Sequence, residues 1–361
     1  MRVLITVDPL TTLNSIINNY LEGMSKYAEV VASASSFWTS NLKFDIINIH
    51  WPEVLVSGMD YKDNLPGLLE ARLKYWKGLG TKIVITYHNR LPHKQKYLDQ
   101  KIYDLIYTNA DGFIHLGDVS LKELSSISKL SEKKHLVIYH PNYLDIPNSI
   151  SREDARKRLG LQMNDIVFIS FGNIRHQEEE DFLIEAFSKL DNRSKKKKLI
   201  IVNALSLAKR TGKAFPITRF KYELWKKKLA KRNIIIEENP YIGDDYIQIY
   251  MNAADVIISP RLYNLNSGII FLAFSFKKIV IGPDTGNIGE FLDKLNNPKF
   301  STVSTDSLRD MMEKSILLID SDIAENNFQF VKNECNIYKI GKQYIDFFDL
   351  VLKEDSLNNK S

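Results

Sequence analysis

The feature that most constrains this sequence is a rhythm repeated along almost the whole chain. Short runs rich in β-branched residues, bounded by turn-forming residues, alternate with longer stretches of helical periodicity. This alternation is typical of a parallel β-sheet covered by helices. The short runs are continuously apolar, as expected for strands that helices cover on both faces. The sequence therefore predicts an α/β fold.

The expected strands fall into two series with helices between them. They are 3–7, 30–32, 46–49, 83–86, 112–115 and 136–139 in the first series, and 166–170, 199–202, 234–236, 256–259 and 279–281 in the second. The expected helices are 13–26, 66–79, 96–109, 120–128, 181–189, 222–231, 245–253 and 268–276, followed by a helical region from 307 to 352. Two Rossmann-like halves of nearly equal size, with a helical tail, account for both series.

The alternation of strands and helices is interrupted between residues 141 and 151. Two prolines and several turn formers there predict a linker, and Ser151 is expected to cap the helix that follows. A length of 361 residues suits two domains at roughly 150 residues each. We expect an amino-terminal domain at 1–147, a second domain at 148–337, and a helix at 338–361 that crosses back to the first.

Ligands of open parallel sheets bind outside the carboxyl ends of the strands. In two such domains these ends can face each other across a cleft. The functional residues should therefore lie just after the strands, which is where the polar motifs of this sequence occur.

In the first domain, two strands end in histidine-containing loops, His50-Trp51-Pro52-Glu53 and His88-Asn89-Arg90. A histidine there can bond a ligand hydroxyl or accept its proton, because its pKa lies near neutrality. The alternative for each is a structural histidine that bonds the loop backbone. Trp51 suits stacking on a ligand, or burial under its loop.

In the second domain, basic and small residues follow the strands. Gly172 allows a close backbone approach, and Arg175 offers a fork that matches phosphate oxygens. Arg261 follows a later strand, and Asn266-Ser267-Gly268 begins a helix. Amides at a helix start form a site for a diphosphate, although these three residues also suit an ordinary helix cap.

Charge and cysteine content exclude several classes of protein. The basic excess lies between residues 148 and 234, with 21 basic against 10 acidic residues, including Lys195–Lys198 and Lys226–Lys228. This excess fits a solvated helix face, or attraction to phosphate or anionic lipid. We expect no nucleic-acid partner, because no reading motif accompanies the charge. The single Cys335 and the absence of a long apolar run predict a cytoplasmic protein without a disulfide.

These motifs resemble the GT-B glycosyltransferases that use nucleotide sugars to build bacterial surface polysaccharides, including exopolysaccharide, capsule and β-mannosyltransferase-like members. The resemblance covers nearly the whole chain. It is most specific from Tyr241 to Glu290, with Asn252-Ala253-Ala254-Asp255, Ser267-Gly268 and Asp284-Thr285-Gly286-Asn287. Phe171–Arg175 matches the first segment of the family's donor domain, and His50–Glu53 is similar to the exopolysaccharide members.

The sequence departs from the family at four positions. Many relatives have an arginine and a lysine that grip the donor diphosphate where this chain has Asn173 and Glu178. The two glutamates of the last donor loop are replaced by Asn264 and Leu272. We therefore expect Arg175 and Arg261, with the amides of residues 266–268, to hold the diphosphate instead.

The resemblance implies a glycosyltransferase that moves a sugar to a hydroxyl of a growing, lipid-linked glycan, without metal or cofactor. The expected catalytic residues are His88 and Glu53, and the expected acceptor contacts are His50, Trp51, Asn89 and Arg90. The expected donor contacts are Gly172, Asn173, Arg175, Arg261, Asn266, Ser267, Gly268 and Asn287. Two alternatives remain, a sugar or nucleotide-sugar binder without turnover and a nucleotide-sugar epimerase. We expect a monomer or dimer.

A lipid-linked acceptor would bring the protein to the inner face of a membrane as a peripheral protein. Two stretches pair aromatic with basic residues at helical spacing, Arg72–Lys77 and Tyr222–Leu229. Such helices can lie in the interface of an anionic membrane. The alternative is an amphipathic helix whose tryptophan packs on the sheet. The first stretch is favoured, because the acceptor enters from the first domain.

Overall fold

The structure is a computed structural model of the chain. It describes residues 1–9, 16–59, 62–92, 96–191, 196–205, 216–238 and 242–358, without the side chains of 216–217 and 354–358. Lys195 of the basic run and Tyr241 of the family motif lie outside the described residues. The chain forms two compact units, unit 1 with Met1–Pro141 and Glu334–Ser361, and unit 2 with Asn142–Asn333.

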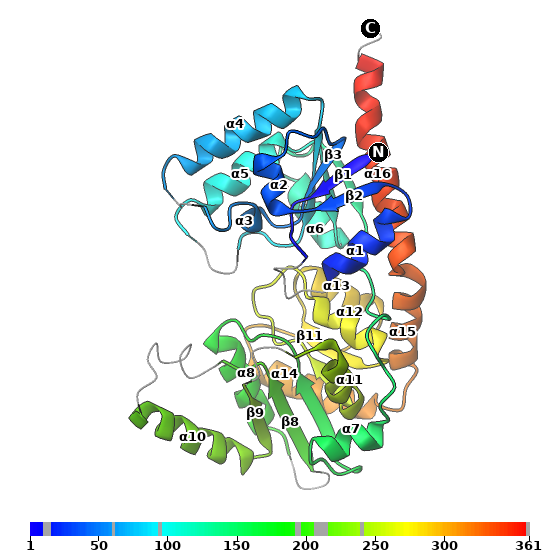
Figure 1. The fold of residues 1–361 in the computed structure, drawn as a ribbon. Helices are drawn as coiled ribbons and strands as arrows, with labels where there is room; N and C mark the ends of the chain where they lie inside the picture. Colours follow the sequence, from blue (N-terminus) through cyan, green and yellow to red (C-terminus); the bar gives the residue numbers. More distant parts are fainter. Residues whose placement is uncertain are drawn as a thin grey trace. The chain divides into compact units, whose positions relative to one another are not determined.

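Unit 1 is a parallel six-stranded sheet flanked by helices (Figure 1). Its strands are β1 (Arg2–Ile5), β2 (Glu29–Ala32), β3 (Ile46–Ile49), β4 (Lys82–Tyr87), β5 (Gly112–His115) and β6 (Lys134–Val137), in the order β2-β1-β3-β4-β5-β6. Its helices are α1 (Ile16–Ser25), α2 (Ala34–Thr39), α3 (Pro52–Leu55), α4 (Leu65–Gly78), α5 (Asp99–Asn109), α6 (Asp118–Ser125) and α16 (Ile337–Asn358).

The strand order of unit 1 reverses between β1 and β3, because β2 lies on one side of β1 and all later strands lie on the other. The register pairs Val3 with Ile46 and Ile5 with Asn48. Asp8 and His50 come after these two strands. They therefore lie at the carboxyl edge of the sheet beside the reversal of strand order, where α/β sheets bind their ligands.

The carboxyl-terminal helix α16 packs directly against α1 of the same unit. Two glycines face each other at this crossing. A Cβ at Gly23 would lie 2.2 Å from the Ile337 carbonyl oxygen, and one at Gly341 would lie 2.1 Å from the Gly23 carbonyl carbon. Both positions therefore require glycine. From α16, Tyr344 reaches the sheet, where its hydroxyl lies 3.3 Å from the Thr86 hydroxyl.

Unit 2 is a second parallel six-stranded sheet with its own helices (Figure 1). Its strands are β7 (Ile166–Ser170), β8 (Lys197–Val202), β9 (Ile234–Glu237), β10 (Val256–Ile258), β11 (Ile279–Pro283) and β12 (Lys299–Phe300), in the order β12-β11-β10-β7-β8-β9. Its helices are α7 (Arg152–Arg158), α8 (Gln177–Ser188), α10 (Pro216–Ala230), α11 (Asp244–Ala253), α12 (Gly268–Ser275), α13 (Gly286–Lys294), α14 (Thr305–Leu317) and α15 (Ile323–Glu334).

In unit 2 the order reverses between β7 and β10, which pair as neighbours from Phe168 and Val256 onward. The loops that contain Gly172 and Arg261 follow these two strands. The predicted α/β class with two Rossmann-like halves and a helical tail is confirmed. The predicted cap is also confirmed, because the Ser151 hydroxyl accepts a hydrogen bond from the Asp154 amide at 3.0 Å.

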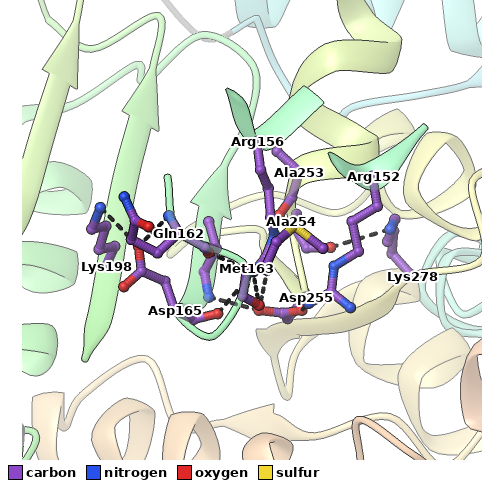
Figure 2. Close-up of polar contacts among 11 residues, drawn as sticks. Arg152, Arg156, Gln162, Met163, Asp165, Lys198, Ala253, Ala254, Asp255 and Lys278 are labelled. Carbon is purple, nitrogen blue, oxygen red and sulfur yellow. Dashed lines mark hydrogen bonds and ion pairs between the residues drawn. The ribbon is translucent and has the colours of Figure 1, made fainter. Parts of the chain in front are cut away.

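At the amino end of β7 and β10, a buried ion network closes the sheet of unit 2 (Figure 2). Asp255 accepts hydrogen bonds from Arg152 at 2.5 Å, from Arg156 at 2.8 Å and from the Val167 amide at 2.8 Å. The fully buried Arg156 also donates to the carbonyl groups of Gln162, Met163, Asp165 and Ala253. Asp255, the acidic residue of the family motif, therefore joins α7 to two strands.

No described helix is long and apolar enough to cross a bilayer. In the stretch Arg72–Lys77, Leu73 and Trp76 are fully buried, and the Trp76 indole donates to the Phe37 carbonyl oxygen at 3.0 Å. In the stretch Tyr222–Leu229, Tyr222 is buried and Trp225 packs against the core of unit 2. Trp76, Tyr222 and Trp225 therefore pack within their own units, as in the alternative given for these stretches, and membrane binding by the stretches stays a prediction.

Candidate functional site

The carboxyl end of the unit 2 sheet gathers several predicted donor-binding residues at the reversal point between β7 and β10. Gly172, two residues after the end of β7, has a φ of +91°. A Cβ there would lie 3.0 Å from the Ile269 Cδ1 atom of α12 and 4.0 Å from Arg261 Nη2. The loop after β7, the loop after β10 and the start of α12 therefore meet at this glycine, which no larger residue can replace without strain.

A buried carboxylate of α8 organises the two arginines of this cluster. Arg261 donates from Nη1 to Glu179 Oε2 at 3.0 Å and from Nη2 to the Asn173 carbonyl oxygen at 2.6 Å. The same Glu179 oxygen accepts from the backbone amide of Arg175 at 3.0 Å. Glu179 therefore fixes both the loop after β7 and the side chain of Arg261.

The other oxygen of Glu179, Oε1, is buried and has no hydrogen-bond partner within the described part of the chain. The hydroxyl of Ser170, at the end of β7, is buried and lacks a partner within the same residues. Unpaired buried polar atoms are costly, and in native proteins they mark functional sites or places for water and ligands. This end of the sheet therefore has unused hydrogen-bonding capacity.

Arg175 is the more accessible arginine of the pair. Its pKa is lowered to about 10, first by desolvation and then by the positive charge of Arg261, against the raising effect of Glu179. Arg261 is buried, and its pKa is lowered mainly by desolvation, against the raising effect of Glu179. Both groups are cations at neutral pH. The pKa shifts show that the two guanidinium groups interact with each other and with the carboxylate of Glu179. An anion beside Arg175 would relieve part of their repulsion.

The start of α12 supplies backbone donors next to these arginines. Ser267 is the N-cap residue of α12, but its side chain makes no capping hydrogen bond to the helix. Its hydroxyl instead lies 3.4 Å from the Ser259 hydroxyl. Asn287 donates to Asn266 Oδ1 at 2.8 Å, which fixes the loop ahead of Gly268. Helix amides left uncapped in this way are suited to bind a phosphate group.

In unit 1, the predicted histidines form a stacked pair at the carboxyl ends of β3 and β4. His50 Nδ1 lies 3.0 Å from His88 Nε2, and the Trp51 ring stacks on His88 with centroids 4.4 Å apart. Burial lowers the pKa of His50 to about 3. The pKa of His88 is well below its usual value because of burial and the nearby His50 and His140. Both rings are therefore neutral at pH 7, which suits a hydrogen bond to a hydroxyl better than removal of its proton.

The other residues predicted in unit 1 have different partners. Glu53 accepts a hydrogen bond from the Tyr103 hydroxyl at 2.5 Å, and burial raises the pKa of its carboxyl group. Arg90 forms a two-bond ion pair with Glu123, at 2.6 and 2.7 Å, and thus points toward α6. Asn89, next to it, is half-buried. The roles of these residues remain predictions.

The comparisons with known proteins concern the fold. No family model matches the chain, and no curated protein matches its sequence. Sucrose-phosphate synthase from Thermosynechococcus elongatus is similar in structure, with a TM-score of 0.69 at 14% identity over 97% of this chain and 98% of that one. HepE from Anabaena, solved with UDP, gives a TM-score of 0.70 at 13% identity over 97% and 100% of the two chains.

A glycosyltransferase from Rickettsia africae is also similar, with a TM-score of 0.64 at 14% identity over 98% of this chain and 99% of that one. The chain has the GT-B fold. This confirms the fold that the motifs implied. The identities are too low to carry an activity, a sugar or an acceptor from these proteins to this chain.

The sequence did not reveal two features of the site. Glu179 lies in the acidic run 178–181, and its partner Arg261 is 82 residues away, so the pattern could not show the pairing. In unit 1, two adjoining hollows of about 400 and 550 Å³ share Trp38 and Met59 in their walls, and Asp8 lines the larger one. Asp8 follows the first strand. The expectation that functional residues lie just after the strands, which selected His50, therefore applies to Asp8 as well.

Proposed function

We propose that this protein is a glycosyltransferase that moves a sugar from a nucleoside diphosphate sugar to a hydroxyl group of a glycan. The observation that carries the proposal is the cluster of Arg175, Arg261 and the uncapped start of α12 at the reversal point of the unit 2 sheet. Support also comes from the similar structures of HepE solved with UDP and with UDP-glucose. A uridine diphosphate sugar is therefore the first donor to test.

In this proposal the cluster stabilises the leaving group. Negative charge builds on the diphosphate as the glycosidic bond breaks, and fixed donors stabilise that charge without reorganising. Arg175 meets the diphosphate directly, and Arg261 holds its loop through Asn173. Gly172, Ser267 and Gly268 allow the phosphates to approach the backbone, and Asn266 and Asn287 hold the adjacent loop.

We infer that the acceptor binds unit 1. The neutral His88 would contact the reacting hydroxyl, with His50 and Trp51 holding its ring in place. Glu53 would be the base, because its raised pKa brings it closer to neutrality. Asn89 and Arg90 would contact more distant sugars. The acceptor we propose is a lipid-linked surface glycan at the inner face of a membrane, as in exopolysaccharide or capsule synthesis.

We propose that neither metal nor cofactor is needed, because Arg175 and the α12 amides supply the charge stabilisation that a metal would otherwise give. The residues that the structure describes contain no group of three or more His, Cys, Asp or Glu side chains placed to hold a metal. Turnover should therefore persist in EDTA. Loss of turnover in EDTA and its recovery with Mg²⁺ would contradict this part of the proposal.

The deciding experiment is incubation of the pure protein with a panel of nucleotide sugars, with and without glycan acceptors. Transfer, or slow hydrolysis without acceptor, supports the proposed enzyme. Binding without turnover would favour the alternative of a binding protein. The reason for that alternative is that Asn264 and Leu272 stand in place of the two glutamates of the last donor loop. A changed sugar on the intact nucleotide would favour the epimerase.

A further inference from the structure

The helix α10 of unit 2 has two faces of opposite character. Its inner face packs Tyr222 and Leu229, both buried, and Trp225, which lies against the core of unit 2. At 3.6 residues per turn, the face directly opposite contains residues 220, 224 and 227, and residue 231 follows directly after the helix. This outer face does not include Tyr222 and Trp225, although Leu224, Lys227 and Lys228 belong to the stretch Tyr222–Leu229 that was predicted from the sequence.

The outer face exposes two large apolar side chains on successive turns. Phe220 is 65% exposed and Leu224 is 42% exposed. They lie four residues apart, so they form one continuous apolar strip along the helix. Among the residues of unit 2 that the structure describes, no packing accounts for them, since the inner face already covers the sheet.

Cations that lack acidic partners surround this strip. The exposed basic residues on and beside the outer face are Arg219, Lys221, Lys227, Lys228 and Lys231. Within the described part of the chain, none of them forms an ion pair with a carboxylate. The acid on this side of the helix, Glu223, is already paired with Lys226 at 3.0 Å. The outer face therefore has a net positive charge around an apolar centre.

We propose that the outer face of α10 binds an anionic lipid bilayer. Apolar side chains flanked by lysines are the pattern of helices that lie in the plane of a membrane interface. The aliphatic parts of the lysines can extend to the head groups while Phe220 and Leu224 enter the acyl boundary. A polyanion such as RNA would use the lysines but leave Leu224 in water, so the pair favours lipid. This surface does not depend on the transfer reaction.

The test is sedimentation of the full-length protein with phosphatidylcholine vesicles, with and without phosphatidylglycerol, at low and high salt. Each lysine near an anionic surface strengthens binding roughly fivefold. K227E/K228E should therefore weaken binding about 25-fold or more. F220S/L224S should also weaken binding, including the part that resists salt. K74E/K77E, with the same charge change on α4, is the matched control and should bind like the wild type.

Three results would overturn the proposal. One is no sedimentation of the wild type with anionic vesicles at low salt. Another is loss of binding in K74E/K77E but not in K227E/K228E. The third is F220S/L224S binding vesicles as well as the wild type while heparin competes fully, which would make the face a general polyanion site. All substituted residues are exposed, so circular dichroism should show folded variants.

Discussion

The two ends of the unit 2 sheet each bury a carboxylate that binds arginine, but they differ in how completely its oxygens are used. At the amino end, Asp255 accepts three hydrogen bonds and uses both of its oxygens. At the carboxyl end, Glu179 uses one oxygen, and its other oxygen has no partner within the described residues. A saturated network stabilises a fold, whereas an unsaturated one leaves capacity for a ligand.

The difference between the two ends of the sheet also shows that a specific family motif does not have to lie at the ligand site. Ala253-Ala254-Asp255 is among the most specific parts of the resemblance. It nevertheless lies at the amino end of the sheet, whereas Arg175 and Arg261 lie at the carboxyl end. Its aspartate is needed to anchor α7 through Arg156. The two ends should therefore respond differently to mutation, one in stability and the other in ligand binding.

The largest effect is expected from Arg156→Met. This change leaves Asp255 buried without its main partner, which costs about 3–5 kcal/mol of unfolding free energy. Urea unfolding measures it. Arg152→Met is the matched control on the same carboxylate, because Arg152 is half-exposed and its pair is worth about 0–1 kcal/mol. Equal losses in both variants would remove the distinction between the two arginines.

The next effect concerns the carboxyl end. Arg175→Ala should weaken binding of a nucleoside diphosphate by ~1.5–3 kcal/mol, the scale of a charged hydrogen bond. Calorimetry with UDP measures the affinity, and Arg152→Met should bind UDP like the wild type. The unfolding free energy of Arg175→Ala should change by only about 0.5 kcal/mol, since its side chain is accessible. An unchanged affinity would show that Arg175 does not meet the diphosphate.

Glu179→Gln should change stability and binding in opposite directions. Loss of the charge that pairs with buried Arg261 should lower the unfolding free energy by about 1–3 kcal/mol. The affinity for UDP should rise, because the negative charge of Glu179 then no longer offsets the positive charge of the two arginines at the diphosphate. A weaker affinity, similar to that of Arg175→Ala, would instead mean that Glu179 acts mainly by positioning the loop.

At neutral pH the smallest effect is expected from the buried histidines of unit 1, because they change stability only as the pH falls. Burial holds the pKa of His50 at about 3 and that of His140 at about 4 in the folded state. The unfolded chain binds these protons at about pH 6.5, so stability is present above that pH and is lost as the pH falls. The loss approaches about 1.4 kcal/mol per pH unit for each histidine. His50→Gln should reduce the slope in urea unfolding between about pH 6.5 and 4; parallel slopes would contradict the role of burial.

Much of the fold could be predicted because its strands are short, apolar and separated by turn residues. The predicted strands 46–49, 112–115 and 166–170 coincide with β3, β5 and β7. The two-residue strand β12 was missed, because Lys299-Phe300 has no run to detect. The region 307–352, predicted only as helical, contains three separate helices, α14, α15 and α16.

The site was less predictable, since it depends on pairs distant in sequence. Position after a strand was enough to select Arg175, Arg261 and His88. It could not show that Glu179 is buried while its neighbour Glu178 is exposed, because that depends on which side of α8 meets the sheet. Nor could it show that Arg90 pairs with Glu123, which lies on α6.

The most direct test of a nucleotide site at the carboxyl end of unit 2 is hydrogen exchange with and without saturating UDP. UDP should slow exchange of the amides of residues 172–176 and 267–270, because the diphosphate would bond to them or cover them. The amides around Arg156 and Asp255, at the other end of the same sheet, should exchange at unchanged rates. Protection confined to the Asp255 end, or no protection in unit 2, would contradict the account.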